Sequence, residues 1–423
     1  MSQNNFIKNL LGLQEENIFF AENPLTTEYI KKRKVNIIRG TITFNPQQCS
    51  HCKGLSSSII KYGFKEVTIK MLSISGFDSY LKLKKQRFFC KTCKKHFIAD
   101  TKLVQRNCSI SYAVKTSISL RLVKLQSIKD IAGIFDVSHT TVSRILKAYK
   151  NKYSPKKNIL PRVLCFDEFK SVKECRGAMS FIYCNGETGE IIDIVEDRKL
   201  ESLRIYFEAF SKEARESVKH IVIDMYKPYM ILIKEMFPKA KVSIDRFHLV
   251  QLINRAFNRT RVLKMNEYRK PDETYYKRLK SSWKLFLKPS TSLTEVRKYH
   301  RSFKKYISQK EIVSILLEKD LELKKAYDTF QDIYFGLKNM NLKYFLQSLK
   351  KAKSKNSTYL STSVKTLKKQ ALKIKNSLKL PYSNGVLEGI NNKIKVLKRL
   401  SFGYRSFDNF KTRILLINNI LKV

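Results

Sequence analysis

The order of the strands and helices expected between residues 162 and 245 constrains the fold of this chain more than any other feature. Apolar runs separated by short polar connections predict the strands, and longer amphipathic segments predict the helices. In chain order the expected elements are strands at 162–169, 178–184 and 190–196, a helix at about 200–214, a strand at 219–224, a helix near 227–236 and a strand at 241–245. Three antiparallel-type strands followed by alternating helices and strands predict a ribonuclease-H-like α/β core.

Two of these strands end in an aspartate that follows apolar residues. Asp167 ends the run that begins at Val163, and Asp224 ends the run that begins at His220. In a ribonuclease-H-like sheet the first and fourth strands are neighbours, so the two carboxylates are expected to face each other. Because adjacent strand residues face opposite sides of a sheet, Glu168 is an alternative to Asp167 on geometry alone. The other acidic competitors in this region are Asp193, Asp197 and Asp245.

A third acidic residue, Glu388, lies in a helix expected at about 383–398. It can join Asp167 and Asp224 only if the chain between them holds an inserted domain. Residues from about 246 to 378 supply one, because they are expected to be almost wholly helical and are rich in lysine. Three converging carboxylates offer the oxygen ligands with which two Mg²⁺ ions, or Mn²⁺ as a substitute, act on a phosphodiester. The sequence therefore predicts a catalytic magnesium site at these three residues.

The helix that carries Glu388 also carries cations. Asn392, Lys395 and Arg399 follow Glu388 at helical spacing, so the four residues are expected on one face. An amide and two cations beside a metal-binding carboxylate suit DNA phosphates. The alternative is a solvated, charged helix face. His248 follows the last expected strand. A structural role is expected for it, and contact with DNA is the alternative.

The net charge indicates a polyanionic partner. The 423-residue chain has 84 Lys and Arg against 36 Asp and Glu, a formal net charge of +48. Such an excess repels itself unless a polyanion is present. The codon preference of an AT-rich genome explains part of the lysine count but not the scarcity of acidic residues, and RNA binding of the ribosomal kind is the other alternative. Together with the three carboxylates, the charge favours DNA.

Four of the eight cysteines form two Cys-x-x-Cys pairs. Cys49 and Cys52 make the first pair, Cys90 and Cys93 make the second, and short β-like runs lie between them. Two such knuckles separated by strands predict a zinc ribbon with one structural Zn²⁺, and the metal would supply folding energy that so small a core lacks. The alternatives are a redox dithiol or a coincidence. The nearby histidines that could substitute as ligands are His51 and His96.

Residues 128–146 predict two helices joined by a tight turn. The first helix keeps apolar residues at helical spacing, and Ser138 is a good N-cap for the second. This pattern is typical of a helix-turn-helix, with an ordinary helical hairpin as the alternative. The residues that the second helix would offer to a DNA major groove are Thr140, Thr141, Arg144 and Lys147, beside His139.

The expected fold class is multidomain α+β: an N-terminal zinc ribbon and helix-turn-helix, then a ribonuclease-H-like α/β catalytic core interrupted by a large all-helical insertion. No secretory signal and no apolar run of about 18 residues is found in the sequence, so a cytoplasmic, nucleoid-associated protein without a membrane partner is expected. The expected domains are an N-terminal segment of mixed helix and loop (1–45), the zinc ribbon (46–100), the helix-turn-helix domain (101–150), a linker (151–160), the first part of the core (161–260), the basic helical insertion (261–378) and the C-terminal helices of the core (379–423).

Several segments resemble the ISL3 family of bacterial insertion-sequence DDE transposases. The segments that carry the resemblance are 165–168 (CFDE), 222–225 (VIDM), 245–248 (DRFH), 383–395 (SNGVLEGINNKIK) and 398–405 (KRLSFGYR). The likeness covers nearly the whole chain, and the last two segments are its most specific part. It implies that Asp167, rather than Glu168, forms a DDE triad with Asp224 and Glu388. Arg405, at the end of the last segment, joins the residues expected to bind DNA.

The resemblance implies a transposase that binds the terminal inverted repeats of an insertion sequence as a homodimer or higher assembly. A metal-activated water would free 3′-hydroxyl ends, which would then attack double-stranded target DNA. One alternative is a DNA-binding regulator with the same binding modules and a decayed core. Another is a structure-specific nuclease, which the dedicated N-terminal binding modules disfavour.

Overall fold

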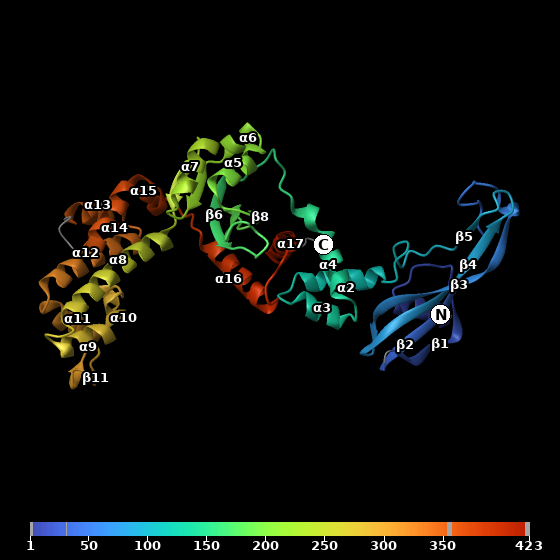
Figure 1. Cartoon of the computed structure of the whole chain (residues 1–423), viewed down its shortest axis with the longest axis horizontal. Helices are drawn as coiled ribbons and strands as arrows, with labels where there is room; N and C mark the ends of the chain where they lie inside the picture. The colour runs from blue at the N-terminus through green and yellow to red at the C-terminus, as the bar shows by residue number, and fades with distance from the viewer. Residues whose placement is uncertain (1–2, 31, 353–357, 419–423) are drawn as a thin grey trace. The chain divides into compact units, whose positions relative to one another are not determined.

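The computed structural model describes residues 3–30, 32–352 and 358–418 (Figure 1). Small parts of the expected N-terminal segment, helical insertion and C-terminal segment therefore lie outside the described residues. The chain forms two compact units, Met1–Tyr153 with Ile394–Val423, and Ser154–Lys393. Among the described helices, none combines the length and the apolar character that crossing a membrane requires.

The first unit begins with a five-stranded sheet in the order β1-β2-β4-β3, with β5 paired to β4. Its strands follow α1 (Gln3–Leu10) and are β1 (Ile18–Ile30), β2 (Arg33–Ile42), β3 (Ile59–Ile74), β4 (Phe77–Cys90) and β5 (His96–Ile98). The expectation of mixed helix and loop for residues 1–45 is wrong for 18–42, where β1 and β2 pair antiparallel. A strand that is distant in sequence stabilises this pair, because β2 also pairs in parallel with β4.

Four helices form the rest of the first unit. They are α2 (Tyr112–Leu122), α3 (Ile128–Ile134), α4 (His139–Lys147) and α17 (Phe407–Asn418), and the short 3-10 helix Lys150–Tyr153 follows α4. The expected cap of α4 is confirmed, since the Ser138 hydroxyl accepts a hydrogen bond from the backbone N–H of Thr141 at 3.2 Å. The Leu416 side chain of α17 is buried in the same apolar cluster as Ile118 and Val142.

The C-terminal helix α17 is bound into this unit by a buried arginine. The Arg413 guanidinium is fully buried and donates hydrogen bonds to the carbonyl oxygens of Lys124 and Gln126 at 2.9 and 2.8 Å. Those carbonyls lie between α2 and α3. The sequence placed all of 379–423 in the catalytic core, whereas in the structure residues from Ile394 onward cluster with residues 1–153.

The second unit is built on a mixed five-stranded sheet in the order β10-β9-β6-β7-β8. Its strands are β6 (Val163–Lys170), β7 (Met179–Asn185), β8 (Ile191–Val195), β9 (His220–Ile223) and β10 (Lys241–Ile244). The first three pair antiparallel, and β9 is parallel to both β6 and β10. The helices that connect these strands are α5 (Leu200–Glu208), α6 (Lys212–Ser217) and α7 (Lys227–Met236).

An aromatic core holds α5 and α7 against one face of this sheet. Phe166 of β6 contacts Phe207 of α5 and Tyr229 of α7, with ring centroids 5.8 and 6.2 Å apart. The single helix expected at 200–214 is two helices, because Ser211 begins α6 by accepting a hydrogen bond from the backbone N–H of Ala214. The strands expected from the sequence agree with β6 to β10 to within one or two residues.

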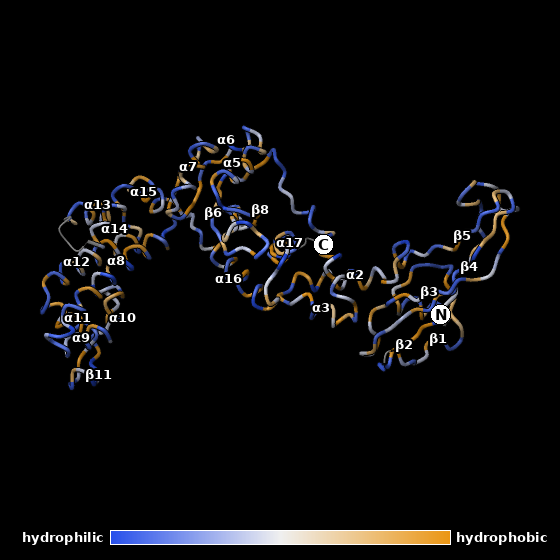
Figure 2. The backbone as a smooth tube through the Cα atoms, viewed as in Figure 1, coloured by the Kyte–Doolittle hydropathy of each residue, from blue (hydrophilic) through white to orange (hydrophobic). Residues whose placement is uncertain are grey.

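A helical region with its own core lies between β10 and the last helix of this unit. Its helices are α8 (Arg246–Glu267), α9 (Glu273–Ser281), α10 (Trp283–Phe286), α11 (Gln309–Glu318), α12 (Leu321–Lys338), α13 (Leu342–Lys351), α14 (Thr358–Lys369) and α15 (Ala371–Lys379). Figure 2 shows hydrophobic and hydrophilic residues interleaved along these helices, as amphipathic packing requires. Phe257 of α8 stacks on Phe330 of α12 at 4.6 Å in that core.

The helical region differs from the sequence-based expectation at one place. A short antiparallel hairpin, β11 (Lys298–His300) and β12 (Lys305–Ile307), interrupts the helices. Helix α15 returns the chain to the sheet, where its Ser377 hydroxyl donates to the carbonyl of Ile244 at 2.6 Å. The helix expected at 383–398 is α16 (Gly385–Leu400), which begins in the second unit and ends in the first.

Candidate functional site

Asp167 and Asp224 lie just beyond the parallel-paired residues of two adjacent strands. The parallel register of β6 and β9 ends with Cys165 opposite Val222, and each aspartate lies two residues beyond its member of that pair. Asp167 is still within β6, where it is held opposite Ile182 of β7, and Asp224 directly follows β9. Both side chains are half-buried. The structure therefore brings these two predicted residues together at one edge of the sheet.

The surroundings of the two carboxylates disfavour their charged forms. Burial is the main cause that raises the pKa of Asp167 to about 6, and the nearby charge of Asp224 acts in the same direction. Burial also raises the pKa of Asp224, with a contribution from Glu168, while His248 lowers both pKa values. Burial and a nearby like charge destabilise the ionised form of a carboxylate, and a bound cation stabilises that form.

Glu168 is committed to other partners. One of its carboxylate oxygens accepts a hydrogen bond from the Arg198 guanidinium, and the other accepts from the Tyr229 hydroxyl at 2.9 Å. Asp167 has one oxygen bonded to the backbone N–H of Glu168 and the other to the amide of Asn391. Both carboxylates are therefore hydrogen-bonded, Glu168 to an arginine and a tyrosine and Asp167 to a backbone N–H and an asparagine amide.

The three remaining acidic competitors have structural partners. Asp193 is buried and accepts a hydrogen bond from the Tyr206 hydroxyl at 2.7 Å. Asp197 accepts from the backbone N–H of Lys199, at the beginning of α5. Asp245 is buried and accepts from the backbone N–H of Asn384 at 3.2 Å, so it helps to fix the start of α16.

Two asparagine side chains hold α16 along β6. The Asn384 amide, just before the helix, donates to the carbonyl of Phe166 at 2.7 Å. The Asn391 amide, two turns later, donates to the Asp167 carboxylate at 2.9 Å. Glu388 follows Asn384 by four residues and precedes Asn391 by three, so it shares their side of the helix. The Glu388 side chain itself is exposed, in the first turn of α16.

The role of Asn391 was not found from the sequence. The spacing of Glu388, Asn392, Lys395 and Arg399 placed Asn392 on the active face, but the neighbouring Asn391 contacts Asp167 instead. Positions i+3 and i+4 both lie close to residue i on a helix, so the doubled asparagine was the available signal. Asn392 is exposed. The three predicted cations downstream, Lys395, Arg399 and Arg405, are exposed and belong to the first unit.

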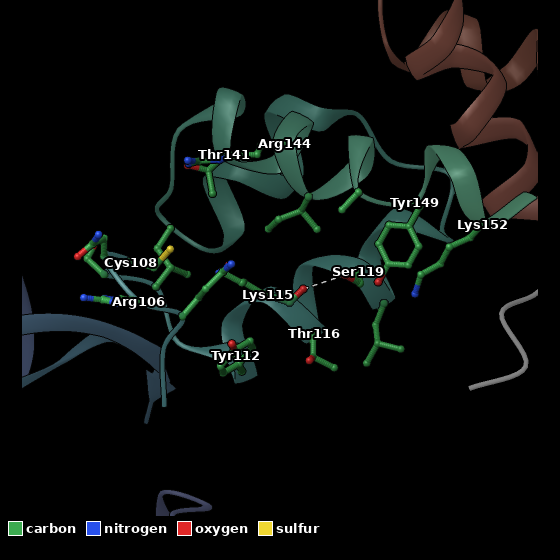
Figure 3. A pocket seen from close by; sticks show the side chains of 17 residues that line it. Arg106, Cys108, Tyr112, Lys115, Thr116, Ser119, Thr141, Arg144, Tyr149 and Lys152 are labelled. Carbon is green, nitrogen blue, oxygen red and sulfur yellow. Dashed lines mark hydrogen bonds between the residues drawn. The ribbon is translucent and has the colours of Figure 1, made fainter. Parts of the chain in front are cut away.

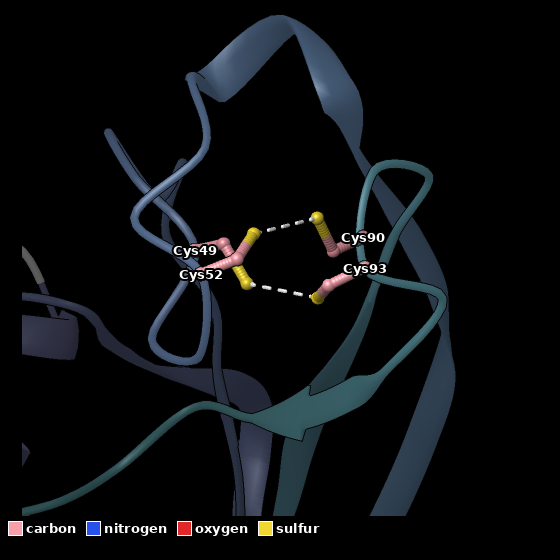
Figure 4. A group of neighbouring side chains, drawn as sticks. All are labelled: Cys49, Cys52, Cys90 and Cys93. Atoms are coloured by element: carbon pink, nitrogen blue, oxygen red, sulfur yellow. Dashed lines mark hydrogen bonds between the residues drawn. The ribbon is translucent and has the colours of Figure 1, made fainter.

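The four predicted zinc ligands converge in the first unit (Figure 4). The sulfurs of Cys49 and Cys93 are 3.7 Å apart, as are those of Cys52 and Cys90. Tetrahedral thiolates at Zn–S distances of about 2.3 Å lie about 3.8 Å apart, whereas a disulfide requires about 2 Å. The spacing therefore fits a tetrahedral metal and excludes disulfides between these pairs.

The thiol chemistry of this cluster is uneven. The backbone N–H of Cys93 is the main cause that lowers the pKa of Cys90 to about 6, and that of Cys52 lowers the pKa of Cys49. Loss of hydration raises the pKa of Cys93 to about 12. Zinc binds the thiolate form of cysteine, so the lowered pKa values of Cys90 and Cys49 favour metal binding at these two residues.

The predicted DNA-reading helix α4 presents three of its four named residues to solvent. Thr140, Arg144 and Lys147 are exposed. Thr141 differs, because its side chain is only 7% exposed and its hydroxyl lies 3.0 Å from that of Ser138. A side chain packed under the N-terminus of α4 does not reach a base edge, so Thr141 supports the helix.

A basic groove of about 810 Å³ lies between α2, α4 and the segment 105–110 (Figure 3). Lys115 and Ser119 of α2 lie across it from Thr141 and Arg144 of α4. The basic residues that line it are Arg106, Lys115, Arg144 and Lys152, and none of its described lining residues is acidic. The groove is therefore a further cationic surface beside the exposed face of α4.

The region that carries the site and the cysteine-bearing segment each match a known protein family. Residues 164–414, more than half of the chain, match the model of the transposase family of ISL3 type. The chain belongs to the ISL3 family of DDE transposases. Residues 45–93 match the zinc finger of the IS204/IS1001/IS1096/IS1165 transposases. The resemblance seen in the sequence is thereby confirmed for the catalytic region and for the zinc module.

The chain is also similar to two individual proteins. The chain is 24% identical over 372 residues to the transposase for insertion sequence element IS1001 of Bordetella parapertussis, a match that covers 87% of each chain. It is 37% identical over 130 residues to a protein named ATP-dependent protease from Lactococcus lactis subsp. lactis. That second match covers 30% of this chain and 42% of the Lactococcus protein.

Proposed function

We propose that this protein is an active insertion-sequence transposase that cleaves DNA ends and joins them to a target. The observation that carries the proposal is the attachment of α16 to β6 by Asn384 and Asn391, with Glu388 between them on the same side of the helix. Membership in the ISL3 family and a net charge of +48 support a DNA substrate.

We further propose that the second unit is a ribonuclease-H-like core interrupted by the helical region. The support is the sheet order β10-β9-β6-β7-β8, with three antiparallel strands and then two parallel ones. In that arrangement Asp167 and Asp224 come from the two central neighbours, β6 and β9, and Glu388 comes from a helix on the same unit.

Asp167, Asp224 and Glu388 would hold two Mg²⁺ ions, for which Mn²⁺ can substitute. Their carboxylate oxygens are the ligands these hard cations prefer, and the two aspartates converge at one edge of the sheet. Bound there, the ions would activate the attacking oxygen and stabilise the leaving oxygen of a phosphodiester. The chain itself contributes the orientation of Asp167, through the amide of Asn391 and the backbone N–H of Glu168.

The first unit would recognise the terminal inverted repeats. One structural Zn²⁺ on the cysteine cluster would fix the sheet, and α3 and α4 would act as a helix-turn-helix. Asp136, in the turn between those helices, contacts the Lys70 ammonium and the Tyr80 hydroxyl of the sheet at 3.5 and 3.2 Å. The zinc-bearing sheet and the DNA-reading helices are thereby joined in one module.

Base readout by α4 would come from Thr140, Arg144 and Lys147, with Thr141 in support. On and after α16, Asn392, Lys395, Arg399 and Arg405 would contact phosphates. Because two ends must be processed together, we propose a homodimer or higher assembly on DNA, acting on the bacterial nucleoid in the cytoplasm.

The decisive experiment compares the parent protein with Asp224→Ala on labelled element-end DNA, with two ends and Mg²⁺ supplied. We expect cleavage by the parent, at least about a thousandfold less by Asp224→Ala because several kcal/mol of charge stabilisation are lost, and equal end binding by both. Glu187→Ala is the matched control, at an exposed acidic residue in the turn between β7 and β8. Equal cutting by parent and Asp224→Ala would remove Asp224 from the site.

The same assay separates the two alternative functions. End binding without cutting, under Mg²⁺ and Mn²⁺ alike and with paired ends, would favour a DNA-binding regulator. Cutting that depends on DNA shape, without preference for the element ends, would favour a structure-specific nuclease.

A further inference from the structure

The hairpin β11–β12 presents two tyrosine rings to solvent. Tyr299 and Tyr306 are directly opposite in its register, with ring centroids 5.6 Å apart and planes at 63°. Their exposed fractions are 59% and 70%. Large aromatic side chains usually bury most of their surface, so a cross-strand pair left this open is a candidate binding surface.

The other side of the hairpin is anchored to the helical region. Ile307, which alternates with Tyr306 along β12, is buried, and so is Phe303 in the loop. The Arg278 guanidinium of α9 lies 4.3 Å from the Phe303 ring and donates to the carbonyl of Ser302 at 3.1 and 2.9 Å. These contacts fix the hairpin from behind, so the tyrosine pair is held outward on a supported element.

The hairpin also carries unneutralised positive charge. Its exposed cations are Lys298, Arg301, Lys304 and Lys305. Within the described part of the chain, none of the four forms an ion pair with a carboxylate. The two nearest acidic residues in sequence, Glu295 and Glu311, are instead paired with Lys310 and Arg297. The surface is therefore aromatic and cationic at once.

We propose that this surface binds a single-stranded segment of DNA, with bases stacked on Tyr299 and Tyr306 and phosphates held by the surrounding lysines and Arg301. Cations alone would suit any phosphate backbone, but the face of a base is open to a tyrosine ring only where the base is unpaired. Strand cleavage by the proposed transposase activity, on which this inference rests, creates strand ends, and the base pairs at a strand end open more readily than those within an intact duplex. The binding itself needs no metal and no chemistry.

The test uses the full-length protein and a labelled oligothymidine of about 16 nucleotides, near the upper end of known site sizes. Binding is measured by fluorescence anisotropy for the parent, for Tyr299→Ala/Tyr306→Ala and for Tyr299→Phe/Tyr306→Phe. We expect about tenfold or greater loss of affinity in the alanine variant, because stacking on two rings is lost, and near-parental affinity in the phenylalanine variant. Tyr29→Ala, at an exposed tyrosine of the first unit, is the matched control.

A second probe reports stacking directly. An oligonucleotide that contains 2-aminopurine should be quenched by the parent and by the phenylalanine variant, but not by the alanine variant. Duplex end DNA should bind the parent and the alanine variant within about twofold of each other, because the cations remain. Unchanged single-strand affinity in the alanine variant would overturn the proposal, as would equal losses for single-stranded and duplex DNA.

Thermal unfolding shows whether the alanine variant still folds, and the phenylalanine variant preserves the test if it does not. The outcome is separate from that of the proposed function. Single-strand binding is measured without Mg²⁺, so a protein that does not cleave DNA can still bind a single strand. Conversely, loss of single-strand binding would leave the evidence from Asp224-dependent cleavage unaffected.

Discussion

The two proposed metal sites of this protein are built in opposite ways. In the first unit, all four donors come from two knuckles of one sheet and already have tetrahedral spacing. In the second unit, two aspartates come from neighbouring strands, whereas Glu388 comes from a distant helix and is exposed. A structural metal fills a closed site, but a catalytic one must leave room for its substrate. The difference indicates that a site whose donor atoms are all in place before the metal binds is a structural site.

The largest effect is expected from a substitution of Glu388, the exposed residue of the three proposed carboxylate ligands. Glu388→Gln keeps the shape of the side chain and removes its charge, so we expect cleavage to fall at least about a thousandfold as metal-held charge stabilisation is lost. End binding, measured by gel shift, should stay near that of the parent. Retention of cutting within about tenfold would mean that the site is complete without Glu388.

The next effect tests the closed site. Cys90→Ser removes one of four zinc ligands, so we expect loss of stoichiometric zinc and a 10- to 100-fold or greater loss of specific end binding, because the metal contributes to folding. Zinc content is measured by elemental analysis of the purified protein, and Cys108→Ser serves as the control. A variant that keeps one zinc per chain would count against the cluster as a metal site.

A smaller effect is expected at the residue that orients Asp167. Asn391→Leu removes the 2.9 Å hydrogen bond, and we expect the Mg²⁺ concentration for half-maximal cleavage to rise about 10- to 100-fold, as for other partners of metal ligands. The thermal stabilisation that Mn²⁺ gives to the free protein should fall in parallel. Asn339→Leu, an exposed site in the helical region, is the control. An unchanged metal requirement would limit Asn391 to holding α16.

The smallest effect concerns the helix that would read DNA. Ser138→Ala removes the N-cap of α4, so we expect a loss of about 1 kcal/mol in the stability of that helix and a severalfold loss of end binding. Zinc content should not change, because the cysteine cluster lies in the sheet. A parallel loss of zinc would show that sheet and helices form one cooperative unit.

The sheet around the aspartates could be predicted because its signals are local. Strands β6 to β10 are short apolar runs, and they place Asp167 within β6 and Asp224 just after β9 without knowledge of distant contacts. The family resemblance chose Asp167 over Glu168, a choice that stays a prediction; in the structure Arg198 and Tyr229 donate hydrogen bonds to the Glu168 carboxylate.

The features that sequence reasoning missed depend on distant partners or on weak local patterns. Strand β2 is stabilised by pairing with β4, about forty residues further along the chain, so residues 18–42 gave no clear strand pattern. The β11–β12 hairpin has strands of only three residues, Lys-Tyr-His and Lys-Tyr-Ile, which are too short for a periodic signal. Asn391 was missed because helical spacing does not distinguish it from Asn392 as a neighbour of Glu388.

Helix α17 has a consequence for how the protein is made. Domains generally fold in the order in which the ribosome produces them. Here the first unit takes its last described helix, with the buried Leu416 and Arg413, from a segment translated after the whole of Ser154–Lys393. A nascent or truncated chain therefore lacks part of the core of this unit, which is complete only once the second unit has also been synthesised.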